Sequence, residues 1–121
     1  MTQVPLISVV DDDESLRESL KGLLRSLGYR NAVFSSAESF LASDAQASAD
    51  CLILDVCMPG MSGPELQREL IARGRKIPII FITAHGDENA ARMMAAGAVD
   101  CLLKPFSEES LLKAIDRALS G

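Results

Sequence analysis

Short apolar runs alternate with longer amphipathic stretches along the whole chain. The runs have the length of strands, and in the stretches the apolar residues recur at helical spacing. The predicted strands span residues 6–10, 32–34, 51–54, 77–83 and 101–103, and the predicted helices span 14–27, 36–43, 64–73, 88–96 and 108–119. The pattern predicts one domain over residues 1–121, with residues 43–49 as the tail of the second helix and a loop.

The first predicted helix shows how these helices would pack. Five leucines share one face of it, and Gly28 follows as a candidate C-terminal cap. The five are Leu16, Leu20, Leu23, Leu24 and Leu27. We expect the helix to lie on a sheet through this stripe.

Polar residues mark the starts of the other helices. Capping boxes are predicted from Ser35 to Glu38 and from Ser62 to Glu65, Asp87 and Ser107 are candidate N-caps, and Gly74 and Gly97 mark ends. Strands 51–54 and 77–82 are apolar without alternation, which is typical of parallel strands covered by helices on both faces. An α/β fold with a doubly wound parallel sheet follows, with strand 77–83 near its centre.

Composition narrows the range of functions. The chain has 12 Lys and Arg against 17 Asp and Glu, a formal net charge of −5, which disfavours direct binding to nucleic acid. Its three cysteines lack C-x-x-C spacing, as expected of reduced thiols in the cytoplasm. No apolar run approaches the roughly 18–20 residues that a membrane span needs. We therefore expect a cytoplasmic protein without a membrane anchor.

Carboxylates follow two of the predicted strands. Asp11 and Asp12 come directly after strand 6–10, and Asp55 comes directly after strand 51–54. The carboxyl ends of parallel strands meet at one edge of the sheet, where crowded carboxylates repel one another unless a cation joins them. Hard oxygen ligands of this kind suit Mg²⁺. Asp13 and Glu14 are interpreted as helix N-terminal charges and are left out of the site.

Two further side chains end strands at the same edge. Thr83 ends the fourth strand with a hydroxyl, and Lys104 follows the fifth with an ammonium group. Asp55 precedes a turn containing Pro59, Gly60 and Gly63, and its carboxylate could attack phosphorus to form an acyl phosphate. Phosphoryl transfer mainly needs alignment and neutralisation of charge, which Mg²⁺ and Lys104 would supply.

The four motifs together resemble the response-regulator receiver family over essentially all 121 residues. They are Asp11-Asp12, Leu-Asp55-Val-Cys-Met-Pro-Gly-Met-Ser-Gly63, Phe-Ile-Thr83-Ala-His and Leu-Lys104-Pro105-Phe. The resemblance implies a CheY-like (βα)5 fold with strand order 2-1-3-4-5. The wording after Thr83 is similar to receivers of nitrogen-fixation-type regulators, which precede a DNA-binding output domain.

The resemblance also implies a role for each motif residue. Asp55 would be the phosphorylated aspartate, Asp12 a direct Mg²⁺ ligand, Asp11 a ligand through water, and Cys57 a ligand through its backbone carbonyl. Thr83 and Lys104 would contact the phosphoryl group, and the Lys104–Pro105 peptide would be cis. Implied partners are a sensor histidine kinase, a C-terminal output domain outside this chain and a second copy in a phosphorylation-dependent homodimer.

One position departs from the family pattern. Many receivers have Tyr or Phe three residues before the lysine, where this chain has Cys101. A thiol is too small to swing inward behind Thr83 as a ring does. This puts in doubt the usual signal to the face formed by helix 88–96, strand 101–103 and helix 108–119. His85 is either a solvated loop residue or a gate for the water that hydrolyses the acyl phosphate.

Three other classes of protein share part of this pattern. A degenerate receiver would share the fold and act by protein binding without phosphorylation. A flavodoxin-like cofactor site is disfavoured because the Asp11–Asp13 carboxylates would repel a phosphate. A haloacid-dehalogenase-like phosphatase would use Asp11 and Asp13, which have the right spacing, but the chain lacks room for a substrate cap.

Overall fold

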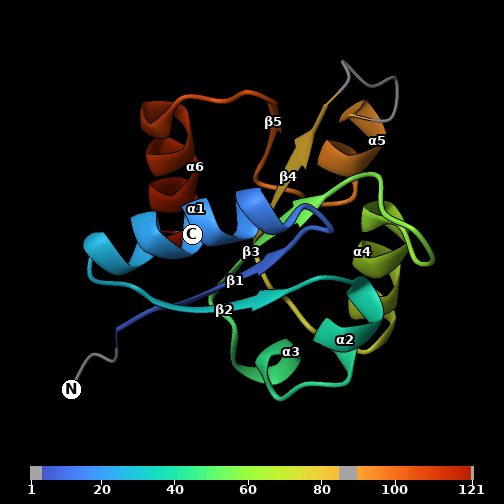
Figure 1. The fold of residues 1–121 in the computed structure, drawn as a ribbon. Helices are drawn as coiled ribbons and strands as arrows, with labels where there is room; N and C mark the ends of the chain where they lie inside the picture. The colour runs from blue at the N-terminus through green and yellow to red at the C-terminus, as the bar shows by residue number, and fades with distance from the viewer. Residues whose placement is uncertain (1–3, 85–89, 121) are drawn as a thin grey trace.

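The computed structural model describes residues 4–84 and 90–120, which form a parallel sheet between two layers of helices (Figure 1). The strand order is β2-β1-β3-β4-β5, which confirms the predicted doubly wound topology. The strands are β1 (Leu6–Val10), β2 (Arg30–Phe34), β3 (Cys51–Asp55), β4 (Ile79–Thr83) and β5 (Asp100–Leu103). The middle strand is β3, and β4 lies beside it near the centre of the sheet, as predicted.

Helices cover both faces of the sheet. On one side lie α1 (Glu14–Ser26) and α6 (Glu108–Ser120), and on the other lie α2 (Ala37–Leu41), α3 (Ala45–Ser48), α4 (Gly63–Ala72) and α5 (Ala90–Ala95) (Figure 1). None of the helices among residues 4–84 and 90–120 is long and apolar enough to cross a membrane.

The two faces of each inner strand build two separate cores. In β4, Ile80 and Ile82 pack with α1 and α6, whereas Ile79 and Phe81 pack with the helices of the opposite face. All five residues of β3 and all five of β4 are buried. This two-sided burial explains why these strands are apolar without alternation.

The second crossover differs from the prediction of one helix over residues 36–43. The chain leaves α2 at Ala42 and starts a separate short helix, α3, in the segment expected to be a loop. The Ser43 hydroxyl donates to the Phe40 carbonyl at 2.8 Å and accepts from the Ala45 amide at 3.2 Å. The Ser43 hydroxyl thus bonds one backbone group before it and one after it, and these bonds replace helical hydrogen bonds between α2 and α3.

Two strands start two residues away from their predicted positions. The fourth strand begins at Ile79 rather than at residue 77, because Pro78 has no N–H to donate to the ladder. The Pro78 carbonyl still accepts a hydrogen bond from the Leu52 amide at 2.9 Å. The second strand starts two residues early, at Arg30, whose amide donates to the Pro5 carbonyl at 3.1 Å.

The capping predictions have mixed outcomes. The capping box between Ser62 and Glu65 is present in both directions, and the Ser107 hydroxyl accepts from the Ser110 amide at 3.0 Å. The box from Ser35 to Glu38 is wrong, because Ser36 caps α2 by accepting from the amide of residue 39 at 3.1 Å. Asp87 lies outside the described residues.

The ends of the helices agree more closely with the sequence pattern. Gly28, Gly74 and Gly97 all have positive φ where α1, α4 and α5 end. In α1, Leu20 and Leu24 are buried, but Leu27 is the C-cap and is exposed, so the predicted stripe is one residue too long.

Candidate functional site

The carboxyl edge of the sheet collects the predicted site residues. Asp55 is the last residue of β3 and Thr83 the last of β4, while Asp11 and Lys104 directly follow β1 and β5. The parallel register places Asp55 beside Ile82 and Thr83 beside Leu103. Four strands therefore end at one place and deliver a polar side chain there.

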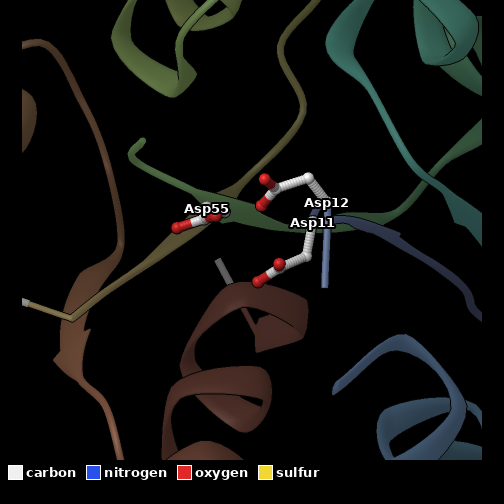
Figure 2. Close-up of side chains that lie close together, drawn as sticks. All are labelled: Asp11, Asp12 and Asp55. Carbon is white, nitrogen blue, oxygen red and sulfur yellow. The ribbon is translucent and has the colours of Figure 1, made fainter. Parts of the chain in front are cut away.

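Three carboxylates form the centre of this edge. Asp11, Asp12 and Asp55 each offer an oxygen, and these oxygens lie within 4.8 Å of one another (Figure 2). Asp11 is fully buried and Asp55 is 5% exposed, whereas Asp12 is open to solvent. Two carboxylates are thus held at the sheet edge, and the third closes the cluster from the solvent side.

Lys104 supplies the opposing charge. Its Nζ lies 2.9 Å from Oδ2 of Asp11 and 3.6 Å from Oδ1 of Asp55. Its backbone N–H donates to the Thr83 carbonyl at 2.7 Å, and the Lys104–Pro105 peptide is cis, as the resemblance implied. Partial burial alone would lower the pKa of Lys104, but the hydrogen bond and charge of Asp11, together with Asp55, outweigh it and raise the pKa.

The Asp55 carboxyl is the group most affected by this environment. Burial and the charge of Asp11 raise its pKa to about 6, against the opposing effects of Lys104 and a hydrogen bond from the Cys57 backbone N–H. Asp55 thus resists ionisation while one ammonium faces the carboxylate cluster. A divalent cation among the three carboxylates would relieve this repulsion, so the donor set fits a metal of the Mg²⁺ class.

Thr83 and Cys57 complete the predicted set. The Thr83 side chain is buried at the end of β4, next to the strand that carries Asp55. The Cys57 thiol is exposed, and its backbone N–H opposes the rise in the Asp55 pKa. The metal contact of the Cys57 backbone carbonyl stays a prediction. The proposed gate, His85, lies outside the described residues, as do residues 86 and 87 of the loop after Thr83.

Asp13 has the structural role expected from its position. Its side chain caps α1 by accepting from the Ser15 amide at 2.9 Å and the Leu16 amide at 3.4 Å. These bonds satisfy N–H groups at the start of the helix. Asp13 therefore serves the helix and does not belong to the carboxylate cluster.

Two contacts at the site were missed from the sequence. The Arg17 guanidinium donates to the backbone carbonyl of Asp11 at 2.7 Å, and Gly63 approaches the backbone of Asp55 so closely that a Cβ there would overlap its oxygen. The sequence marks Gly63 as a turn residue but does not predict this contact. Arg17 carries no motif, and only the position of α1 against β1 reveals its role.

Cys101 lies half-buried on β5, with Phe81 as its neighbour on β4. It packs against the core cluster that includes Met93 of α5 and Ala98. A sulfur atom therefore occupies the place where the family pattern has an aromatic ring.

Comparison with known proteins agrees with this geometry. The family model for the response regulator receiver domain matches residues 7–116. The chain belongs to the response regulator receiver domain family. Its site fits the phosphoacceptor switch of two-component response regulators, the class to which this family belongs.

The related regulators are longer than this chain. The chain is 51% identical over 118 residues to the response regulator protein TmoT of Ectopseudomonas mendocina, covering 97% of this chain and 54% of that protein. It is 40% identical over 120 residues to the transcriptional regulatory protein FixJ of Bradyrhizobium diazoefficiens, covering 98% of this chain and 58% of FixJ. The chain thus spans little more than half the length of these relatives.

Solved structures give the same result. The response regulator StyR superposes with a TM-score of 0.91 at 50% identity, covering 98% of this chain and 60% of that one. FixJ-N superposes with a TM-score of 0.88 at 41% identity, covering 98% and 96%. The predicted resemblance to nitrogen-fixation-type receivers is therefore confirmed, alongside similarity to other response regulators.

Proposed function

We propose that this chain accepts a phosphoryl group on Asp55 in a Mg²⁺-dependent, self-catalysed reaction and reports it to a partner. The observation that carries the proposal is the burial of Asp55 between two other carboxylates and one ammonium at the ends of parallel strands. A structural carboxylate has no need of this combination. A nucleophile that must bind a dianionic phosphoryl group needs both the cation site and the lysine.

In this reaction a carboxylate oxygen of Asp55 forms a bond to phosphorus while the bond from phosphorus to the leaving group breaks. The leaving group takes the electron pair, and Asp55 acts without a separate base because it reacts as the anion. Lys104 neutralises one phosphoryl oxygen, and the Thr83 hydroxyl donates to another. Hydrolysis by water later restores the carboxylate and releases inorganic phosphate.

Asp11, Asp12 and Asp55, with the backbone carbonyl of Cys57, would hold the metal. Mg²⁺ in this place would neutralise charge on the phosphoryl oxygens and align them with Asp55. Lys104 already pairs with Asp11, so the site balances part of its charge before the cation binds. Before the cation binds, the Cys57 backbone N–H favours the ionised form of the Asp55 carboxyl.

The proposed output surface is the face of α5, β5 and α6. Met94 of α5 and Leu103 of β5 are 44% and 54% exposed, apolar side chains that a partner could cover. Phosphorylation would draw Thr83 toward Asp55 and shift the balance between two conformations of this face. Because Cys101 replaces the usual ring, we propose that the signal reaches the face through the backbone after Thr83.

The proposed partners follow from the family. A sensor histidine kinase would be the phosphodonor, and the greater length of the TmoT and FixJ proteins supports a C-terminal output domain that acts in transcription. A homodimer formed after phosphorylation would bring two such domains together. We propose that the chain acts in the cytoplasm, where it would meet its kinase and where its cysteine thiols would stay reduced.

The decisive experiment is intact mass spectrometry after incubation with acetyl phosphate, with Mg²⁺ and then with EDTA. We expect a gain of about 80 Da, the mass of one phosphoryl group, only with Mg²⁺. Asp55→Asn should abolish the gain without unfolding the domain. Asp44→Asn is the matched control, because Asp44 is exposed and makes no side-chain cap bond in α3.

Each outcome decides between two functions. Mg²⁺-dependent labelling that persists in Asp55→Asn would refute the acceptor assignment. No labelling of the parent protein under any condition would favour a degenerate receiver, which signals by binding alone through the face of α5, β5 and α6.

A further inference from the structure

Glu38 links two segments that are far apart in the chain. It lies on α2, and its Oε2 accepts a hydrogen bond from the Met61 backbone N–H at 3.0 Å. The capping box predicted for Glu38 does not form, because Ser36 and Ser39 cap α2 between themselves. The Glu38 carboxylate instead bonds the loop between β3 and α4, which directly follows Asp55.

The backbone next to Met61 is shaped to admit this carboxylate. Gly60 has a φ of +77°, a conformation that favours glycine, and a Cβ built there would lie 2.7 Å from Oε2 of Glu38. The Glu38 oxygen thus rests directly on the main chain of the loop. Any larger residue at position 60 would have to displace it.

Both ends of the loop are fixed by other contacts. At the end of the loop, the Gly63 amide donates to the Val56 carbonyl at 3.0 Å, and the Ser62 capping box begins α4. At its start, the Cys57 backbone N–H lies close enough to the Asp55 carboxyl to oppose the rise in its pKa. Glu38 holds the stretch between these two anchors, in which Gly60 and Met61 lie.

We propose that Glu38 is a positioning residue, which holds the loop so that the Cys57 main chain faces the phosphoacceptor and the metal. The inference rests on the proposed function, because the Cys57 backbone carbonyl can contribute to a metal site only if the carboxylate cluster binds a cation. A group that bonds directly to a metal ligand commonly changes metal affinity by about 10- to 100-fold when it is lost, and Glu38 acts one step further away, through Met61. Since the Glu38 contact is exposed, we expect the lower end of that range.

The test compares two variants that remove the same charge. Glu38→Ala removes the acceptor, whereas Glu38→Gln keeps an amide oxygen that can accept from Met61. The readouts are the Mg²⁺ dissociation constant from calorimetry and the hydrogen-exchange rate of the Met61 amide. We expect Glu38→Ala to weaken Mg²⁺ binding about tenfold and to speed exchange at Met61, and Glu38→Gln to stay within about twofold of the parent.

A third variant covers the possibility that Glu38→Ala does not fold. Glu38→Asp keeps the charge and shortens the side chain by one methylene, so it should lose the bond to Met61 and weaken Mg²⁺ binding like Glu38→Ala. Circular dichroism before each titration establishes that the variant is folded. If Mg²⁺ binding is weakened in Glu38→Asp and retained in Glu38→Gln, the effect comes from the position of the acceptor oxygen and not from the charge.

The outcomes separate this inference from the function on which it rests. Equal weakening in Glu38→Ala and Glu38→Gln would show a charge effect and overturn the positioning role. Unchanged Mg²⁺ affinity in Glu38→Ala, with a parent that binds Mg²⁺, would overturn the inference alone. A parent protein that does not bind Mg²⁺ would overturn the metal-dependent function and this inference with it.

Discussion

The Lys104 ammonium lies closer to Asp11, at 2.9 Å, than to Asp55, at 3.6 Å. Lys104 is thus paired first with a carboxylate proposed to hold the metal and only second with the proposed acceptor. A cation that enters the cluster competes with Lys104 for Asp11, and a phosphoryl group on Asp55 would attract Lys104 away from it. The lysine can therefore change partners as the site fills.

This pairing predicts opposite effects of Lys104→Met on metal binding and on chemistry. Removing a positive charge beside Asp11 should tighten Mg²⁺ binding by roughly two- to tenfold, because cation and ammonium repel each other. The initial rate of labelling by acetyl phosphate should fall at least about tenfold, because one phosphoryl oxygen loses its counter-charge. Calorimetry and timed mass spectra measure the two effects. Weaker Mg²⁺ binding in Lys104→Met would contradict the competition.

A second prediction concerns stability and pH in the presence of EDTA. The folded-state pKa of Asp55 is raised to about 6, so the folded domain holds this proton more tightly than the unfolded chain does. The resulting stabilisation is present below about pH 4 and is lost as the pH rises through 6. At pH 8 the ionised Asp55 therefore costs free energy that Asp55→Asn avoids.

Urea unfolding at several pH values measures this difference. After allowance for relaxation around Lys104, Asp55→Asn should exceed the parent in unfolding free energy by about 1–2 kcal/mol at pH 8, and by much less at pH 4. Added Mg²⁺ should stabilise the parent and narrow the gap. A gap that is independent of pH would mean that Asp55 is not the group responsible.

The three cysteines should differ in reactivity. Cys57 is exposed, Cys101 is half-buried, and burial with the nearby Asp50 charge raises the pKa of the Cys51 thiol to about 12. Because thiolates react and thiols do not, iodoacetamide at pH 8 should label Cys57 first and Cys51 only after unfolding. Peptide mapping by mass spectrometry gives the order. Rapid labelling of Cys51 in the folded protein would contradict its placement in β3.

The Ser8 hydroxyl predicts a stabilising substitution. Ser8 is fully buried in β1, and its Oγ has no hydrogen-bond partner among the residues that the structure describes. Ser8→Ala should raise the unfolding free energy by about 1 kcal/mol, because an unpaired buried hydroxyl is costly. Ser48→Ala is the control, since that exposed hydroxyl donates to the Asp44 backbone carbonyl and its loss should change stability by less than about 0.5 kcal/mol. Destabilisation by Ser8→Ala would point to an unseen partner.

Glu38 and residues 43–49 depart from the predicted structure for the same physical reason. Glu38 has the spacing of a capping box with Ser35, yet it bonds Met61, which is 23 residues away. Residues 43–49 are polar enough for a loop, but Ala45 is buried against the core and the segment folds into α3. In both cases a contact with a distant segment outweighs the local preference, and such contacts leave no periodic signal in the sequence.

The sequence by itself determined the fold class, the five strands and the residues that gather at their carboxyl ends. It could do so because apolar periodicity, turn residues and the placement of Asp11, Asp55, Thr83 and Lys104 directly at strand ends are local properties. Only the tertiary structure decided that Lys104 pairs with Asp11 before Asp55, that burial raises the pKa of Asp55, and that Glu38 accepts a hydrogen bond from the loop beyond it. Distances, burial and charge coupling arise between segments that the fold brings together, and for that reason they cannot be obtained from the order of residues alone.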